Sequence, residues 1–297
     1  MKAQSSTSPD RVFSELRKRL FTTAYAMLGS RADAEDVVQD AWLRWQVADH
    51  ANLRSAEAWL VTVTTRLALD RLRERKAERE SYPGWWLPEP LVEVDENTPE
   101  TAAELASDVS LALLWMLERL SGEERAAFLL RQAFDQDYAD IAVLLSKSEA
   151  NCRQLVHRAK EKMRDDRPRF QPTPEAHRKL LGAFMQAAGR GDRQAMKALL
   201  SPDVAFISDG GGKAESFHRI LRGAGRIAGI FWRIENLYSG CVQYRMARIN
   251  GEPGLLRYVN GTIESAQSFL IEDGRIATVF IVRNPDKLTG APRHFSP

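Results

Sequence analysis

The sequence predicts a chain of several domains, in which two all-helical blocks precede a C-terminal α+β domain. Apolar residues recur at three- and four-residue steps in two separate stretches, which is the helical period. A Pro-rich acidic segment divides those stretches. Asn-Gly and Asp-Gly pairs separate strand-like runs near the C-terminus, as in β-hairpins. The length of 297 residues leaves room for several domains. From these patterns we expect a helical block at 10–80, a connector at 81–110, a second helical block at 111–168 and an α+β domain at 172–297.

The first block reads as three helices. "RVFSELRKRLFTTAYAML" repeats apolar residues on one face and stops at Gly29. "DAEDVVQDAWLRWQ" begins with Asp33, which we expect to be its N-cap. "SAEAWLVTVTTRLALDRLRERK" follows, with Ser55 as the expected N-cap and a basic C-terminal end.

Two surfaces of this block are candidates for binding. The second helix carries polar residues and one leucine on a shared face, and such a face is usually only solvated. The third helix combines an aromatic residue with a basic end, next to a polar loop. That combination suits the binding of unpaired bases, but a basic helix end that is merely solvated would show the same residues. The residues concerned are Asp36, Gln39, Asp40 and Leu43 on the second helix, and Asn52, Arg54, Trp59, Arg66, Asp70 and Arg71 in and after the loop.

The connector at 81–110 holds two adjacent tryptophans, Trp85 and Trp86, among prolines. Exposed indoles are unfavourable in water, so the pair predicts a surface that covers them. The segment contains no Lys or Arg. Its seven acidic residues are Glu89, Glu93, Asp95, Glu96, Glu100, Glu104 and Asp108.

The second block ends in a helix-turn-helix pattern. A short helix from Tyr138 to Leu145 breaks at a polar turn, and a basic helix begins near Glu149. Inserted into the major groove, such a helix brings long basic side chains to phosphates and base edges. The pattern favours DNA binding over a plain amphipathic surface helix. The candidate contacts are Lys147, Ser148, Arg153, His157 and Arg158.

The C-terminal domain is mildly basic, with 17 basic and 11 acidic side chains in residues 171–297. We expect helices packed on a curved antiparallel sheet, a build that often encloses a pocket. The expected helices are 174–189, 192–200 and 223–237, and the expected strands are 241–249, 254–259, 262–272 and 275–282.

Enzymatic and metal-binding motifs are missing from the sequence. Its two cysteines, Cys152 and Cys241, form no CxxC pair, so neither a zinc site nor a disulfide framework is expected. Asp209, His218 and Asp273 could serve acid–base chemistry, but isolated Asp and His residues are more often found in turns. We expect no cofactor and no metal. The N-terminus lacks a signal-peptide core, and no apolar run is long enough to cross a bilayer, so we expect a cytoplasmic protein without membrane contact.

Three helical motifs, in order and at matching spacing, resemble the conserved regions of extracytoplasmic-function sigma factors, the promoter-recognition subunits of bacterial RNA polymerase. They are "AEDVVQDAWLRW", "AWLVTVTTRLALDRLR" and the run from Leu120 to Met163. The remainder is similar to the sigma-J-like subgroup, which carries a C-terminal SnoaL-like domain of the NTF2-like cone fold. Its signatures are "WLPEP" (86–90), "DGGGK" (209–213) and "NPDKL" (284–288).

The resemblance implies roles for the candidate residues. Asp36, Gln39, Asp40 and Leu43 would dock on the clamp helices of core polymerase, whose flap is a second expected contact. Asn52, Arg54, Trp59, Arg66, Asp70 and Arg71 would read the −10 element of promoter DNA. Lys147, Ser148, Arg153, His157 and Arg158 would serve the −35 element. An interdomain regulatory contact would use Trp86, Leu87, Pro88, Asp209, Lys213, Asn284, Asp286 and Lys287.

The resemblance also predicts a regulatory arrangement and leaves alternatives. The acidic connector would thread the basic channel of the polymerase, and the fused domain would replace a separate anti-sigma protein. We expect this chain to have no enzymatic activity. The SnoaL-like fold also hosts cyclases and isomerases, however, and its pocket could sense a small ligand. A DNA-binding repressor is the third reading, and a repressor would need no −10 reader.

Overall fold

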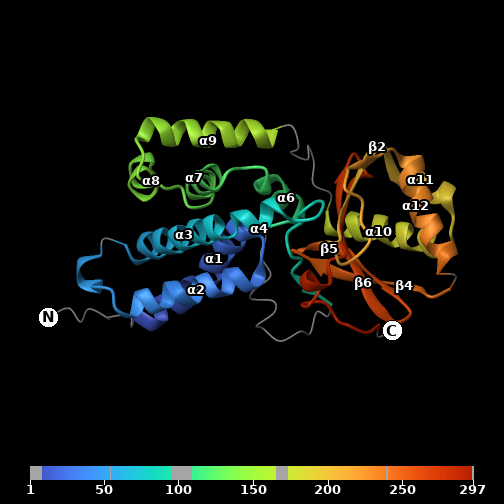
Figure 1. The fold of residues 1–297 in the computed structure, drawn as a ribbon, viewed down its shortest axis with the longest axis horizontal. Coiled ribbons are helices and arrows are strands. Elements are labelled where there is room, and N and C mark those ends of the chain that lie inside the picture. The colour runs from blue at the N-terminus through green and yellow to red at the C-terminus, as the bar shows by residue number, and fades with distance from the viewer. Residues whose placement is uncertain (1–8, 54, 95–108, 165–172, 239, 296–297) are drawn as a thin grey trace. The chain divides into compact units, whose positions relative to one another are not determined.

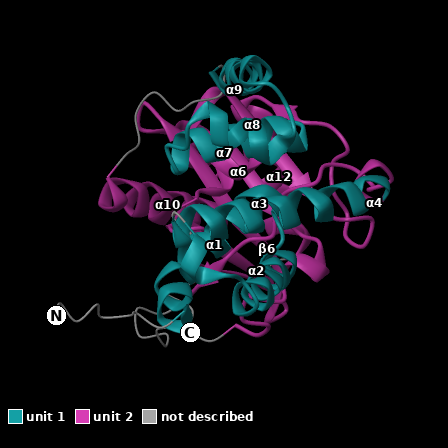
Figure 2. Cartoon of the chain, turned by 90° about the vertical axis from the view of Figure 1, so that its left-hand side faces the viewer, with its two compact units in different colours: residues 1–77, 116–166 teal, residues 78–115, 167–297 magenta. Residues whose placement is uncertain are grey.

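The computed structural model describes residues 9–53, 55–94, 109–164, 173–238 and 240–295. The chain forms two compact units, shown in teal and magenta in Figure 2. The first unit joins residues 1–77 to residues 116–166. The second joins residues 78–115 to residues 167–297. The described part of the connector, residues 81–94, therefore folds with the C-terminal domain.

The first unit begins with three packed helices, followed by a basic segment. Buried Leu20, Tyr25, Val37 and Leu60 form part of their shared core. Ser55 caps the third helix, since its side chain accepts a hydrogen bond from the Ala58 amide. The helices are α1 (Pro9–Leu28), α2 (Arg31–Gln46) and α3 (Ala56–Glu74), with a 3-10 turn η1 (His50–Asn52) between the last two. A short α4 (Lys76–Glu80) follows, and its residues are divided between the two units.

The predicted N-cap of α2 was wrong. Ser30 is the cap, and its hydroxyl accepts from the amide of Asp33, which lies three residues into the helix. The Asp33 carboxylate is instead buried and pairs with Arg71 and Arg75 of α3 and its C-cap. Its role is therefore to join two helices.

The same unit contains the second helical block. Ser121 and Glu124 form a reciprocal capping box at the start of α7. The helix α8 ends at Ser146, whose left-handed φ of 54° makes the tight turn. Buried Ile141 of α8 and Cys152 of α9 contribute to the core of the block. The elements are α6 (Leu111–Glu118, whose residues are divided between the two units), α7 (Gly122–Ala133), α8 (Tyr138–Leu145) and α9 (Glu149–Arg164).

In the second unit, helices α10, α11 and α12 pack against a curved sheet (Figure 1). Between them lies an apolar core that includes Phe184, Phe231 and Phe269. The described strands form one sheet in the order β1-β4-β5-β6-β7-β2-β3. The helices are α10 (Pro174–Gly189), α11 (Arg193–Leu199) and α12 (Ala224–Leu237). The strands are β1 (Val92–Glu93), β2 (Leu200–Asp209), β3 (Leu221–Arg222), β4 (Val242–Ile249), β5 (Glu252–Val259), β6 (Thr262–Glu272) and β7 (Arg275–Val282).

The hairpin predictions hold at all three turns. Asn250-Gly251, Asn260-Gly261 and Asp273-Gly274 each place both residues at positive φ, which is the conformation that type I′ turns require. Two helical blocks followed by an α+β domain confirm the predicted fold class.

Two features of the sheet differ from the prediction. The pair β2–β7 is parallel, so the sheet is mixed rather than purely antiparallel. The connector also supplies an edge strand, since Val92 pairs with Ile249 and Glu93 with Arg248. Neither short β1 nor the parallel pairing has a local sequence signature, because both depend on strands far away in the chain.

Candidate functional site

The site of interest lies where the connector meets the end of β2. Asp209, the last residue of β2, is fully buried. Its carboxylate accepts hydrogen bonds from the Tyr82 hydroxyl (2.6 Å), the Leu87 amide (2.9 Å) and the Lys287 ammonium (2.7 Å). Two of these donors come from the connector and one from the C-terminal tail. One carboxylate therefore joins three segments distant in sequence.

Lys287, in the 3-10 turn η2 (Pro285–Lys287), completes the junction. Its Nζ donates to the Leu87 carbonyl at 2.6 Å and lies 3.3 Å from the ring centroid of Trp86. A cation over an indole face is stabilised by the ring quadrupole, more strongly when both are desolvated. The ammonium is thus held by a carboxylate, a carbonyl and an aromatic face together.

Tyr82 was not predicted as part of this site. Burial, and then its hydrogen bond to Asp209, raise the pKa of the Tyr82 hydroxyl, which therefore stays a donor at neutral pH. The hydroxyl also accepts a hydrogen bond from Asn284 Nδ2 at 2.9 Å. A single tyrosine before a proline carries no sequence signal for such a role.

The glycines of the 209–213 loop permit the close approach of the connector. A Cβ on Gly211 would lie 2.8 Å from the Tyr82 hydroxyl and would also collide with the Asn284 amide. A Cβ on Gly212 would lie 2.8 Å from Pro83. Both glycines have positive φ, which other residues rarely adopt. The run of glycines thus permits close backbone contact between the loop and the connector.

The two tryptophans of the connector are covered within the second unit. Trp86 packs edge-on to Tyr82, with the Arg79 guanidinium 4.6 Å from its ring centroid. Trp85 packs edge-on to Trp115, which in turn lies beside Phe280 of β7. Leu87 and Pro88 are buried too.

The rest of the connector is fixed by Asn250 at the β4–β5 turn. The backbone amide of Asn250 donates to the Leu91 carbonyl, and the side-chain Oδ1 of Asn250 accepts from the backbone amide of Leu91. Lys213 and Asp286 form an exposed ion pair at the rim of the junction. We call the contact of residues 82–94 with Asp209, Asn250, Asn284 and Lys287 the dock.

In the first unit, the predicted polymerase-binding face of α2 is exposed. Asp36, Gln39 and Asp40 are all accessible, and Leu43 beside them is 58% exposed. Asp36 lies 3.6 Å from Arg71 of α3. The face therefore combines negative charge with an open apolar residue.

The predicted −10 residues are spread around η1 and α3. Asn52 is exposed and donates to the Asp49 carboxylate at 2.6 Å, within the loop. Trp59 is half-buried against Trp45, with ring centroids 5.5 Å apart. Arg66 and Asp70 are exposed, whereas Arg71 lies between Asp33 and Asp36. Arg54 falls outside the described residues.

In the helix-turn-helix, most of the predicted side chains already have acidic partners. Arg153 donates to Glu149 at 2.7 Å and lies over the Tyr138 ring, while Lys147 lies 3.2 Å from Glu123. Arg158 lies 3.5 Å from Glu124. The Ser148 hydroxyl accepts from the Asn151 amide, and His157 is exposed.

Glu124 also fixes α9 on α7. Burial alone would raise the pKa of its carboxyl, but hydrogen bonds from Lys162 and Ser121 outweigh burial and hold the pKa below its ordinary value. The carboxylate is therefore charged at neutral pH and anchors the basic helix.

The two helical blocks of the first unit also contact each other. Arg125 of α7 is 3% exposed and donates to the carbonyl of Met27 at the end of α1, and it pairs with Glu118 at 3.0 Å. Arg19 of α1 reaches the Ala133 carbonyl at 3.2 Å. A buried guanidinium at a helix C-terminus is favourably placed in the helix dipole.

Comparison with protein families finds two matches. The description "Sigma-70 region 2" fits residues 12–78, and "Sigma-70, region 4" fits residues 110–163. Across the described residues, no helix is long and apolar enough to span a membrane.

Similar proteins span almost the whole chain. The ECF RNA polymerase sigma factor SigJ of Mycobacterium tuberculosis is 37% identical over 94% of this chain and 93% of its own. The probable ECF RNA polymerase sigma factor SigI of the same species is 30% identical over 92% of each chain. The crystal structure of Mycobacterium tuberculosis SigJ matches with a TM-score of 0.78 and 35% identity, covering 95% of this chain and 99% of that one.

Proposed function

The chain belongs to the extracytoplasmic-function RNA polymerase sigma factors, and from that premise we propose how its two units divide the work. It is an alternative sigma factor that binds core polymerase and promoter DNA and directs transcription initiation. The C-terminal α+β unit, with its SnoaL-like fold, would then regulate the two helical regions. The whole protein would act with the polymerase in the cytoplasm.

Core binding would use the exposed face of α2. Asp36, Gln39 and Asp40 with open Leu43 suit a basic partner such as the clamp helices of the polymerase, and region 4 would contact the flap. Charge complementarity of this kind speeds association and sets orientation.

Promoter reading would be divided between the two helical regions. Asn52, Arg54, Trp59, Arg66, Asp70 and Arg71 would serve the −10 element. Lys147, Ser148, Arg153, His157 and Arg158 would serve the −35 element. Lys147 and Arg153 have acidic partners in partly exposed ion pairs, so promoter phosphates must displace pairs that each contribute little, about 0–1 kcal/mol.

Regulation would depend on the dock, and the triple use of the Asp209 carboxylate is the observation that supports it. While Leu87 and Tyr82 are hydrogen-bonded to Asp209, the connector cannot follow an extended path through the polymerase. Contacts of Arg125 and Arg19 hold region 4 on region 2 in the same state. We propose that polymerase binding separates the two regions and releases the dock, and that no separate anti-sigma protein is required.

An enzymatic role for the C-terminal unit is less well supported. Val204 and Phe206 of β2 belong to the core beneath the helices, so the alternation of a strand turns Asp209 to the opposite face of the sheet. Its carboxylate is also occupied by three donors. The residue considered for acid–base chemistry therefore serves the dock, and we propose no enzymatic activity for this domain.

The experiment that tests the proposed function is reconstituted transcription with purified core polymerase. Holoenzyme formed with this chain should initiate at one defined promoter position, and core alone should not. Reversing the charge of Asp36 and Asp40 to Lys should abolish co-purification with core, whereas reversal of exposed Asp203 and Glu215 in the C-terminal unit should leave it intact. Normal core binding by a folded Asp36/Asp40 variant would remove this face from the proposal.

A further inference from the structure

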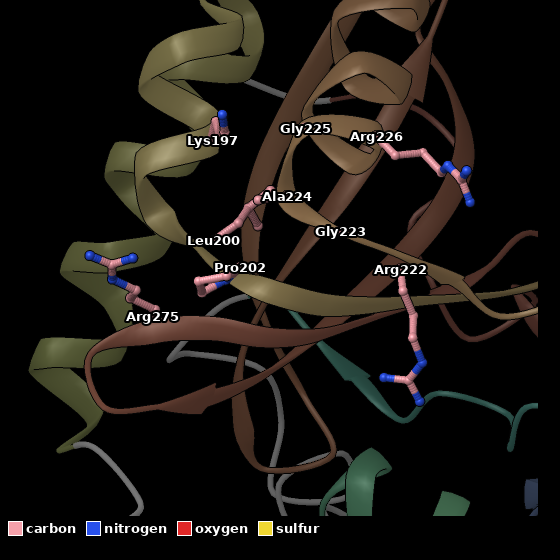
Figure 3. A pocket seen from close by; sticks show the side chains of 9 residues that line it. All are labelled: Lys197, Leu200, Pro202, Arg222, Gly223, Ala224, Gly225, Arg226 and Arg275. Atoms are coloured by element: carbon pink, nitrogen blue, oxygen red, sulfur yellow. The ribbon is translucent and has the colours of Figure 1, made fainter.

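A hollow on the C-terminal unit is bordered by cations and lies apart from the dock. Its volume is about 500 Å³, and it sits at the start of α12. Figure 3 shows the side chains that line it. The four cationic residues of the hollow, which we call the basic patch, are Lys197, Arg222, Arg226 and Arg275.

The charges of the basic patch are not neutralised within the chain. All four side chains are exposed, and none has an acidic partner within ion-pair distance among the residues that the structure describes. No carboxylate lines the hollow. This contrasts with the cations of region 4, most of which are paired. A group of unpaired cations on one surface attracts a polyanion.

The backbone at the patch adds to the positive potential. Gly223 caps α12 without a side chain, so no side-chain oxygen covers the amides of Ala224 and Gly225 at the start of this helix. The guanidinium of Arg193 also lies beside the hollow, where it donates to the Gly225 carbonyl at 3.1 Å.

The arrangement favours an extended polyanion over a small one. In Figure 3 the side chains of Arg222, Arg226 and Arg275 point in different directions around the hollow and do not converge on one point. A single phosphate ion could reach only part of the set. A nucleic-acid backbone presents successive phosphates along its length and can meet dispersed cations.

A protein partner fits the patch less well. Leu200 and Ala224, which line the hollow, are buried, at 1% and 6% exposed, and Pro202 is the exposed apolar residue beside the four cations. Protein interfaces usually present aromatic or aliphatic anchors at their centre, and no aromatic residue lines this hollow.

We propose that the basic patch is a sequence-independent contact for the phosphate backbone of duplex DNA, which the C-terminal unit makes when the holoenzyme occupies a promoter. The inference rests on the proposed promoter-binding function, and it adds a DNA contact outside regions 2 and 4. The fused domain would then strengthen promoter occupancy as well as regulate it.

The test compares salt dependences of holoenzyme binding to duplex DNA. The patch variant changes Lys197, Arg222, Arg226 and Arg275 to Gln. The control variant changes four other exposed cations of the same unit, Arg178, Lys179, Arg190 and Arg233, to Gln. Affinity is measured over a series of KCl concentrations on a promoter duplex and on a duplex with both promoter elements scrambled. Thermal unfolding verifies that each variant is folded.

We expect the patch variant to flatten the slope of log K against log salt by about 0.9 for each phosphate that it no longer neutralises, up to about 3.6. The change should be the same on both duplexes, and the control variant should keep the wild-type slope. Equal slopes for patch and control variants would overturn the inference. So would stabilisation of the free chain by inorganic phosphate that the patch variant lacks, because a small anion would then be the occupant. If wild-type holoenzyme fails to prefer the promoter, the proposed function fails, while slopes on the scrambled duplex still decide the inference.

Discussion

At the scale of single residues, Lys287 is the side chain that the dock depends on most. It is 7% exposed and neutralises Asp209, which is fully buried. Two buried charges that face each other are weak evidence of net stability, but removal of one leaves the other unpaired in a poor solvent. The pair therefore acts as a condition for docking, because the carboxylate is tolerated only while its partners are present.

Lys287→Met should destabilise the second unit by about 3–5 kcal/mol, because the Asp209 charge then lies buried without its cation. Urea unfolding followed by tryptophan fluorescence measures the change. Adding Asp209→Asn to the variant should recover a large part of the loss, since the neutral amide still accepts a hydrogen bond from the Leu87 amide. Additive effects of the two substitutions would contradict the pairing.

His177 gives the second unit a predictable pH dependence. Burial on α10 lowers the pKa of this imidazole from 6.5 to about 4, because the charged form is poorly solvated there. Its contribution to stability is complete above pH 6.5 and is lost as the pH falls toward 4, since the unfolded state binds the proton first.

Between pH 7 and pH 5 the free energy of unfolding should fall by on the order of 2 kcal/mol through His177 alone. Urea unfolding of wild type and His177→Leu at both pH values isolates this part, and the variant should show a smaller decrease. An equal decrease in both proteins would show that other groups account for the pH dependence.

At the scale of elements, the loop 209–213 sets how closely the connector can approach. Gly211→Ala should open the dock, because the new methyl group would meet Tyr82 and Asn284. Gly274→Ala is a matched control, since Gly274 also has positive φ but has open space around its Cβ position. We expect faster hydrogen exchange across residues 82–94 in the first variant and wild-type exchange there in the second. Similar exchange in both would mean that backbone strain, and not the methyl contact, controls the loop.

Elements governed by local chemistry were predictable, and those governed by distant partners were not. Asn-Gly and Asp-Gly turns were correct because positive φ is a local demand, and the break at Ser146 was correct for the same reason. The parallel pairing of β2 with β7 was missed, because no local pattern distinguishes it. The α2 cap was misplaced because Ser30 and Asp33 are both capping residues, and only the partners Arg71 and Arg75 reveal the role of Asp33.

The same limit applies to the site. Trp86, Asp209 and Lys287 could be connected from sequence only through motifs that resemble a family, because they lie about 80–200 positions apart. Neither Tyr82 nor Asn250 carried a sequence signal for its role in the dock. The tryptophan pair was informative, since exposed indoles predict a covering surface, and the covering residues proved to include Tyr82, Arg79 and Trp115.

At the scale of the whole molecule, the connector determines how the chain can be used. In the free protein it folds as part of the C-terminal unit, with an edge strand, buried Leu87 and a shared carboxylate. A sigma factor bound to polymerase needs this segment to join regions 2 and 4 at promoter spacing. Under the proposed function these two requirements need different geometries, so we propose two states whose balance polymerase shifts by binding one of them better.

Hydrogen exchange on residues 82–94, in the free chain and in holoenzyme, tests this account most directly. In the free chain the amides of Leu87 and Leu91 should exchange slowly, because they donate to Asp209 and Asn250. Binding of core polymerase should make the Leu87 amide exchange faster as the dock opens. An amide that exchanges at the rate of an unstructured peptide in the free chain, or one equally protected in both states, would contradict the account.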